Sequence, residues 1–170
     1  MKHTIAVMVE NKPGVLSRIA NLFSARGFNI DSLVVGETED PTISRMTIVL
    51  RGDGGTIEQV SKQLNKLIDV IKVVDLSHEN FIARDLALIR VNITTATRGR
   101  LLELAQVFRA RVVDISPKSA IVEVTGDEEK VQALLELLRS FGVQEMVRTG
   151  EVAMSRRGNG KRPTTKDTKE

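Results

Sequence analysis

The feature that most constrains the fold of this chain is the order in which its hydrophobic periodicity changes over the first 77 residues. Residues 3–10 alternate between apolar and polar, with Ile5, Val7 and Val9 on one side, as in a half-buried strand. After a break at 11–14, apolar residues recur every three or four positions, which predicts an amphipathic helix. Two further strands, a second helix and a last strand follow.

Local breaks and caps place the other elements of this first half. The first helix is expected to begin at Val15, and Gly27 suits its C-terminal cap. Thr56 can N-cap the second helix. The predicted helix faces are Val15, Ile19, Leu22 and Phe23, and then Ile57, Val60, Leu64, Leu67 and Ile68; the strands are 28–35, 44–50 and 70–76. The order β-α-β-β-α-β is that of a ferredoxin-like fold, with both helices on one face of an antiparallel sheet.

The second half has the same order of elements with almost no residue identity to the first. Its predicted strands are 85–94, 112–116, 119–125 and 143–148, and its helices are 101–108 and a helix N-capped by Asp127. We therefore predict an α+β protein with two tandem ferredoxin-like (βαββαβ) domains. The expected limits are a first domain at 1–77, a linker at 78–84, a second domain at 85–154 and a tail at 155–170. Domains this small bury only about 60% of their surface, so we expect dimerisation or tight domain packing.

The composition excludes several classes of site. The chain has no cysteine, which rules out disulfides, thiolate metal sites and cysteine nucleophiles. Its two histidines, His3 and His78, are far apart in sequence and have no carboxylate at ligand spacing, so we expect no metal site. There is no Gly-x-Ser-x-Gly motif or paired acid–base constellation, so we expect no catalytic residue. There is no run of eighteen apolar residues and no signal-peptide pattern, so we expect no membrane partner and a cytoplasmic location.

The positive net charge belongs to the C-terminal end of the sequence. Residues 155–170 carry six Lys or Arg and two Asp or Glu, whereas the remaining residues carry nineteen and twenty. Without this segment, the net charge of +3 becomes −1. A short, polar, basic segment of this kind is typical of a disordered tail, with a nucleic-acid-binding arm as the alternative. We expect no nucleic-acid partner.

The segment Asn11-Lys12-Pro13-Gly14-Val15 is the most informative motif, because it joins a strand to the start of a helix. Backbone N–H groups at a helix N-terminus lack partners and favour an anion. Gly14 lets a ligand approach those amides, and Asn11 adds a side-chain amide, so the segment suits a carboxylate beside an ammonium group. The same residues also make a good turn, and spacing alone leaves both interpretations open.

Residues 4–19 (TIAVMVENKPGVLSRI) resemble the opening of an ACT domain, the amino-acid-sensing ferredoxin-like module. More specifically, they are similar to the small regulatory subunits of acetolactate (acetohydroxyacid) synthase. The resemblance continues in 26–33 (RGFNIDSL), 44–47 (SRMT), 85–89 (DLALI), 108–110 (FRA) and 149–156 (TGEVAMSR), with Arg98 also matching. It covers residues 2–157, and 158–170 have no counterpart in the pattern.

The resemblance implies a regulatory chain in branched-chain amino acid (valine, leucine, isoleucine) biosynthesis. It implies a homodimer that binds valine between two ACT domains, activates the acetolactate synthase catalytic subunit and confers feedback inhibition. The implied effector contacts are Asn11, Gly14, Val15 and Leu16 of one subunit and Asn29 and Ile30 from the edge strand of its partner. Asn29 could instead be a routine turn residue. Thiamine diphosphate, Mg and FAD are implied only in the catalytic subunit, which the second domain is expected to contact.

Three other functions fit the same fold. One is an ACT-type amino-acid sensor for another enzyme. A second is an RRM-like RNA-binding module, but this requires aromatic residues on the central strands, and 44–50 contain none. A third is an acylphosphatase-like hydrolase. Arg18 lies nearby, but we expect it, as the fourth residue of the helix, to point away from the loop at 11–14. The Gly-rich loop with its arginine that such a hydrolase needs is also missing.

Overall fold

The computed structural model describes residues 1–157, and the expected tail beyond Arg157 lies outside the described residues. The elements are β1 (Lys2–Glu10), α1 (Val15–Ala25), β2 (Ile30–Glu37), β3 (Ile43–Arg51), α2 (Gly54–Asn65), β4 (Val70–Asp75), β5 (Phe81–Asn92), α3 (Arg98–Val107), β6 (Arg111–Ile115), β7 (Ser119–Gly126), α4 (Glu128–Leu138), a 3-10 turn (Arg139–Phe141), β8 (Val143–Arg148) and β9 (Val152–Ser155). They form two compact units, and each has the predicted βαββαβ order.

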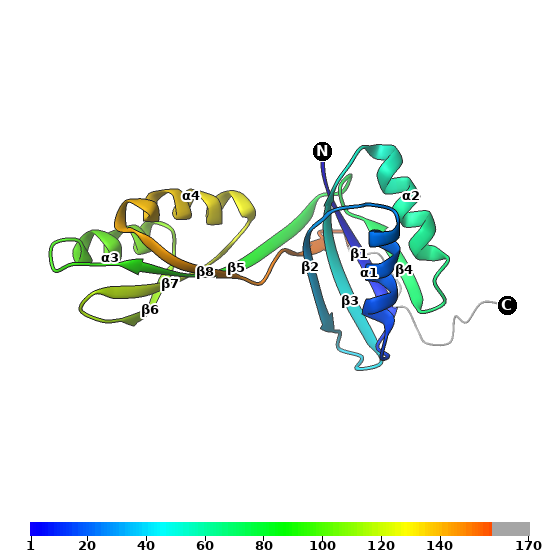
Figure 1. Ribbon diagram of the computed structural model, residues 1–170, viewed down its shortest axis with the longest axis horizontal. Coiled ribbons are helices and arrows are strands. Elements are labelled where there is room, and N and C mark those ends of the chain that lie inside the picture. Colours follow the sequence, from blue (N-terminus) through cyan, green and yellow to red (C-terminus); the bar gives the residue numbers. More distant parts are fainter. Residues whose placement is uncertain (158–170) are drawn as a thin grey trace. The chain divides into compact units, whose positions relative to one another are not determined.

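The first unit is a four-stranded antiparallel sheet in the order β2-β3-β1-β4, with α1 and α2 on one face (Figure 1). Val7 lies opposite Met46 on β3 and opposite Val73 on β4, so these three side chains share the helix-facing side. Val15, Ile19, Leu22 and Phe23 of α1 pack into the same core, as the helical periodicity predicts. The ferredoxin-like prediction for this half is confirmed.

The other face of this sheet is partly covered. Ala6 lies opposite Thr47, and both side chains are buried although neither faces the helices. β9 belongs to the same unit, and the Arg45 guanidinium donates from Nη2 to the Ala153 carbonyl at 2.7 Å. Burial lowers the pKa of Arg45, which is consistent with a guanidinium partly withdrawn from water. The short strand β9 therefore lies against the sheet face that sequence analysis left open.

The second unit repeats the arrangement, with strand order β6-β7-β5-β8 and with α3 and α4 on one face (Figure 1). Ile89 lies opposite Val122 and Met146 in the helix-facing core. The N-cap prediction for Asp127 is confirmed, because its carboxylate accepts from the Lys130 amide at 2.9 Å. The two-domain prediction is therefore confirmed at the level of topology.

Several boundaries differ from the expected ones. The first unit comprises residues 1–82 with β9, and the second comprises 83–151. The expected linker at 78–84 includes the start of β5, and the expected tail at 155–170 begins inside β9. Asp53, not Thr56, caps α2, because the Asp53 carboxylate accepts from the Thr56 amide at 2.8 Å. Ile68 is 92% exposed beyond the end of α2, so its assignment to the helix face is wrong.

Candidate functional site

Helix α1 begins after Gly14, which cannot provide a side-chain cap. No side chain caps its N-terminus, and its first turn contains no acidic residue. By contrast, carboxylates of Asp53 and Asp127 cap α2 and α4. The N-terminus of α3 also lacks a side-chain cap. The first amides of α1 therefore have the partial positive charge that attracts an anion, and no side-chain carboxylate of the helix competes for them.

Gly14 has the backbone conformation that this entry into α1 requires. Its φ of +85° lies in the left-handed region, where residues with a Cβ are strained. A Cβ built on Gly14 would lie 3.1 Å from Nη1 of Arg18 and would meet no other atom outside the neighbouring residues except Cζ of Arg18. The absence of a side chain thus leaves room between the helix amides and a guanidinium group.

Asn11 is held at the end of β1 by two hydrogen bonds. Its Nδ2 donates to Oε1 of Glu37 at 3.1 Å and to the Pro41 carbonyl at 2.9 Å. Both amide protons are used, and within residues 1–157 the Asn11 side-chain oxygen receives no hydrogen bond. This oxygen can therefore accept a hydrogen bond from an ammonium group, as the sequence interpretation requires.

Val15 and Leu16 can offer a ligand different groups. The Val15 side chain is buried in the core beneath α1, and its backbone amide makes a long hydrogen bond of 3.4 Å to the Lys12 carbonyl. The Leu16 side chain is 45% exposed and lies in the first turn of the helix. Leu16 can therefore contact an aliphatic ligand, whereas Val15 can contribute only an N–H group that a ligand would have to draw from its long bond to Lys12.

Asn29 and Ile30 lie at the opposite end of the sheet from Asn11. Ile30 pairs with Leu50 of β3, at the end of the sheet where β1 begins. Glu37, at the other end of β2, pairs with Ser44 of β3. Over the eight residues of β2 the separation is roughly 23 Å, so one chain does not bring the two groups together. β2 is an edge strand, as expected for these residues. The Asn29 side-chain amide donates to Asp31 Oδ1 at 3.3 Å.

Arg18 does not point away from the loop at 11–14, so that expectation is wrong. Side chains of a helix lean toward its N-terminus, and positions 14 and 18 are neighbours on one face. The Arg18 side chain accordingly reaches back beside Gly14, where Nε and Nη2 donate to Oδ2 of Asp69 at 2.8 and 2.6 Å. The spacing of four residues from Gly14 is the signal that could have identified Arg18 from the sequence.

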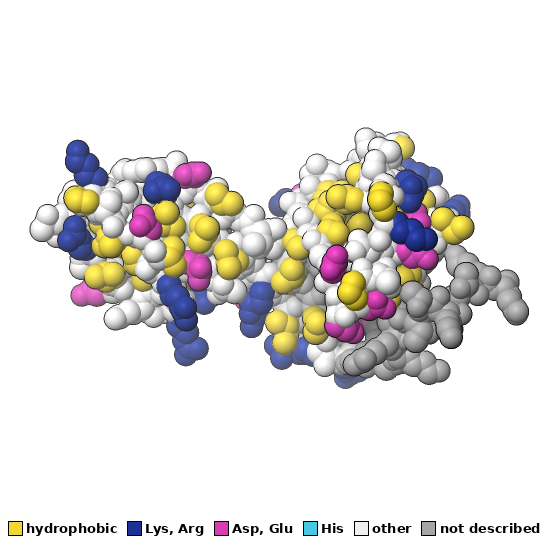
Figure 2. Space-filling view, turned by 90° about the horizontal axis from the view of Figure 1, so that it is seen from below, with side chains coloured by type: hydrophobic (Ala, Val, Ile, Leu, Met, Phe, Trp, Pro, Cys, Tyr) yellow, Lys and Arg dark blue, Asp and Glu magenta, His cyan; other side chains and the backbone are white. Residues whose placement is uncertain are grey.

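Lys12 adds a second cation to this region. Its Nζ lies 2.8 Å from Oε2 of Glu10, and this hydrogen bond raises the pKa of the Lys12 ammonium. The Lys12 side chain is 62% exposed, and that of Glu10 is 38% exposed. Elsewhere, Figure 2 shows Lys and Arg side chains interspersed with Asp and Glu on one face, without a broad basic area. Each cation beside the start of α1 is paired with a carboxylate, Lys12 with Glu10 and Arg18 with Asp69.

Comparison with known proteins identifies the family. Residues 5–72 match the family model "AHAS small subunit-like ACT domain", and residues 84–157 match the model "Small subunit of acetolactate synthase". The chain belongs to the acetolactate synthase small-subunit family. A relative from Archaeoglobus fulgidus, called a probable acetolactate synthase small subunit, is 58% identical over 95% of this chain and all of its own length. The acetolactate synthase small subunit of Mycolicibacterium smegmatis is 50% identical over 93% of both chains.

A solved structure extends the family assignment to the fold. The acetolactate synthase small subunit from Thermotoga maritima is 44% identical, with a TM-score of 0.85 over 92% of this chain and 98% of that one. The first unit is thus an ACT domain of the acetolactate synthase small-subunit family, as the resemblance implied.

Three further observations concern the other expected classes of site. Within residues 1–157, no three His, Asp or Glu side chains come together as a possible metal site. In the same part of the chain, no helix is long and apolar enough to cross a membrane. The side chains on the sheet face where an RRM-like module would stack bases include Ala6, Arg45 and Thr47, and none is aromatic.

Proposed function

We propose that this chain is the regulatory subunit of a cytoplasmic acetolactate synthase in branched-chain amino acid biosynthesis. It binds valine, activates the catalytic subunit and confers feedback inhibition. The observation that carries the proposal is the similarity over nearly the whole chain to proteins named acetolactate synthase small subunits. The reaction itself belongs to the catalytic subunit, which supplies thiamine diphosphate, Mg and FAD, while this chain supplies the effector site.

The effector site needs two copies of the chain. Asn11, Gly14 and Leu16 lie at one end of β2, and Asn29 and Ile30 lie at its other end. When two copies pair antiparallel along their β2 edges, residue 30 of one copy comes beside residue 37 of the other. A two-fold axis through β2 therefore completes two equivalent sites, each with contributions from both subunits. The exposed edge of β2 supports this arrangement.

The chemistry of each half-site fits a small amino acid. The Leu16 amide binds the carboxylate, and the Val15 amide joins it by exchanging its long bond to the Lys12 carbonyl for one to the ligand. The Asn11 side-chain oxygen accepts from the ammonium group. Leu16 contacts the aliphatic side chain, with Ile30 of the partner subunit on the other side. Asn29 of the partner subunit adds a second amide for the polar end of the ligand. Valine has the three groups that this set of residues can recognise.

The second unit is proposed to contact the catalytic subunit. The part of its sheet that faces away from α3 and α4 carries partly exposed apolar residues, including Leu88 and Val147, which are paired neighbours. In the ACT unit β9 covers part of the corresponding face. The contrast supports a division of labour, with effector binding in the first unit and activation through the second.

Direct titration tests the effector assignment. Purified full-length chain is titrated with L-valine, L-leucine and L-isoleucine in a calorimeter, and its oligomeric state is measured by sedimentation with and without valine. We expect saturable binding of at least valine to a dimer, with two sites per dimer. An absence of binding for all three amino acids would refute the proposed effector site.

A further inference from the structure

Arg18 brings a fixed positive charge to the opening left by Gly14. Nη1 of Arg18 lies 3.1 Å from the position that a Gly14 Cβ would occupy. Within residues 1–157, Nε and Nη2 are engaged by Asp69, and Nη1 makes no hydrogen bond. The guanidinium therefore places Nη1, a donor that Asp69 does not use, beside Gly14 at the start of α1.

Asp69 holds this guanidinium from the interior side. The Asp69 side chain is only 10% exposed, whereas that of Arg18 is 49% exposed. The Asp69 backbone is anchored as well, because its carbonyl accepts from the Glu10 amide at 2.9 Å beside β1. A planar guanidinium fixed on a buried carboxylate loses little freedom when its free edge binds a second carboxylate.

Lys12 is the other cation of this region, but it is less suited to the task. Its partner Glu10 is itself 38% exposed, and Lys12 is 62% exposed. Ion pairs between long, exposed side chains are mobile and weak. Arg18 combines a free planar edge, a buried anchor and a position beside Gly14, and Lys12 has none of these three.

We infer that Arg18 binds the α-carboxylate of the effector together with the α1 amides, and that Asp69 positions it. This inference rests on the proposed function, because it concerns the same site. Its consequence is selectivity: the site prefers an amino acid with a free carboxylate to the same molecule with a neutral amide. Charge-assisted hydrogen bonds of this kind correspond to about tenfold or more in affinity.

Calorimetric titration of the full-length chain with L-valine and with L-valinamide tests the inference. The wild type is expected to bind valine at least about tenfold more tightly than valinamide. Arg18→Gln should lose that preference by weakening valine binding about tenfold or more, with valinamide affinity changed less than about twofold. Arg18→Lys keeps the charge without the planar fork and should restore part of the preference.

Two further variants separate binding from folding. Arg18→Gln leaves the Asp69 carboxylate buried without its partner, so the double variant Arg18→Gln/Asp69→Asn is titrated in parallel to remove that charge. Lys62→Gln removes an exposed partner of Glu58 on α2 and serves as the matched control, with no expected change. Thermal unfolding of each variant confirms that the titrated protein is folded.

The possible outcomes distinguish the two proposals. Wild-type protein that binds no valine refutes the proposed effector site and this inference with it. If the wild type binds valine and folded Arg18→Gln or the double variant keeps the same preference over valinamide, the site remains and the role of Arg18 is overturned. Selective loss of the preference in those variants supports the role of Arg18.

Discussion

Gly14 shows how one residue combines a backbone requirement with an electrostatic one. Its left-handed φ lets the chain turn from β1 into α1, and its missing side chain leaves Arg18 and the helix amides accessible. The motif around Asn11 and Gly14 was sufficient to find the start of α1. It was not sufficient to place Arg18, because that required the direction in which a helical side chain leans.

Replacing Gly14 by aspartate should abolish valine binding without unfolding the protein. The new carboxylate lies against Nη1 of Arg18 and takes the place of the ligand carboxylate. The positive φ costs about 1 kcal/mol of stability, which aspartate tolerates better than most residues. Calorimetry with valine and thermal unfolding check both parts. Gly99→Asp is the control, since a Cβ there meets nothing within 4 Å. Unchanged valine affinity in Gly14→Asp would contradict the placement of the site.

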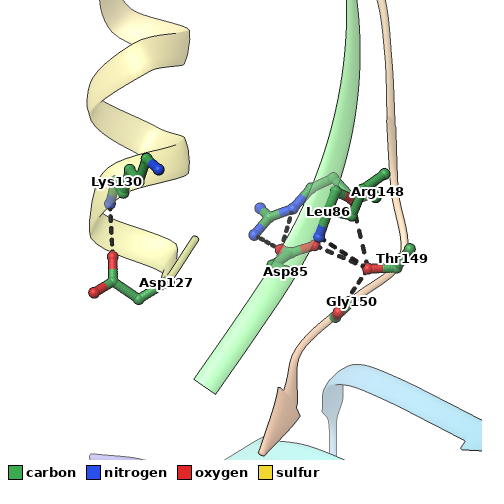
Figure 3. Close-up of polar contacts among 7 residues, drawn as sticks. All are labelled: Asp85, Leu86, Asp127, Lys130, Arg148, Thr149 and Gly150. Carbon is green, nitrogen blue, oxygen red and sulfur yellow. Dashed lines mark hydrogen bonds and ion pairs between the residues drawn. The ribbon is translucent and has the colours of Figure 1, made fainter. Parts of the chain in front are cut away.

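A second residue-scale prediction concerns the ion pair between Asp85 and Arg148 in the second unit (Figure 3). The Asp85 side chain is 3% exposed and accepts from Nε of Arg148 at 2.8 Å and from Thr149 Oγ1 at 3.3 Å. Arg148→Gln leaves this carboxylate buried without its cation, so the free energy of unfolding should fall by about 3 kcal/mol. Asp85→Asn/Arg148→Gln, which removes both charges, should lose less.

Urea unfolding of the single and double variants measures this difference. Arg139→Gln is a matched control, because Arg139 and Glu136 form an exposed pair on the same unit. That control should change stability by less than about 0.5 kcal/mol. A loss in Arg148→Gln no larger than in Arg139→Gln would show that the buried carboxylate does not need its partner.

Among the elements, those with a clear period were predicted well and those defined by distant contacts were not. The alternation of Ile5, Val7 and Val9 was enough for β1, and Asp127 for the start of α4. Gly54 and Gly55 favour helix poorly, so the sequence pattern indicates a break at 52–55 and a cap of α2 at Thr56. The cap at Asp53 nevertheless forms, since its carboxylate also accepts from the Thr56 hydroxyl at 2.9 Å.

Strand β9 is the element that sequence reasoning missed. It has only four residues, Val152–Ser155, and it pairs with β5, about seventy positions earlier in the chain. No local period marks so short a strand, and its role depends on a sheet face that only the folded ACT unit presents. The same limit applies to Asn29 and Ile30, whose proposed function depends on a second copy of the chain.

The cap of α2 leads to a prediction about pH. Hydrogen bonds from Thr56 lower the pKa of Asp53 in the folded protein below its ordinary value near 3.9. The stabilisation by the ionised cap is therefore present above about pH 4 and is lost as the pH falls through the lowered folded-state pKa. Asp53→Ala should lower the urea midpoint at pH 7, and the difference from wild type should shrink as the pH is lowered through this range.

Urea titrations at several pH values between 7 and 2 make this measurement. Asp53→Ser is the matched control, because serine caps a helix about as well as aspartate but does not titrate there. It should keep most of the stability at pH 7 without this pH-dependent component. A deficit in Asp53→Ala that stays constant down to pH 2 would contradict the assigned cap.

At the scale of the whole molecule, the two units share one topology but differ in what lies against their sheets. The ACT unit is completed by β9 after the chain has passed through the second unit. A fragment that ends near residue 80 lacks β9 and the Ala153 carbonyl that accepts from Arg45. Such a fragment would expose the sheet face that carries Ala6 and Thr47, so it is a poor isolated ACT domain.

Replacing residues 83–151 by a short glycine-rich linker gives a better test of whether the first unit binds the effector and the second unit activates the catalytic subunit. Ile82 and Val152 both belong to the first unit, and the Arg156 amide donates to the Asn80 carbonyl at 2.9 Å. This shortened chain should bind valine with an affinity within about threefold of the full chain and fail to activate the catalytic subunit. Calorimetry and synthase assays measure the two properties, and activation by the shortened chain would refute the assignment of that contact to the second unit.

The central claim is that this chain makes acetolactate synthase sensitive to valine through the site at the start of α1. The most direct measurement is acetolactate formation by the catalytic subunit alone, with wild-type chain and with Gly14→Asp, over a range of valine concentrations. We predict higher activity with either chain than without, valine inhibition only with the wild type, and insensitivity with Gly14→Asp. Equal valine inhibition with the wild type and Gly14→Asp, or no effect of the wild type on activity or inhibition, would contradict the claim.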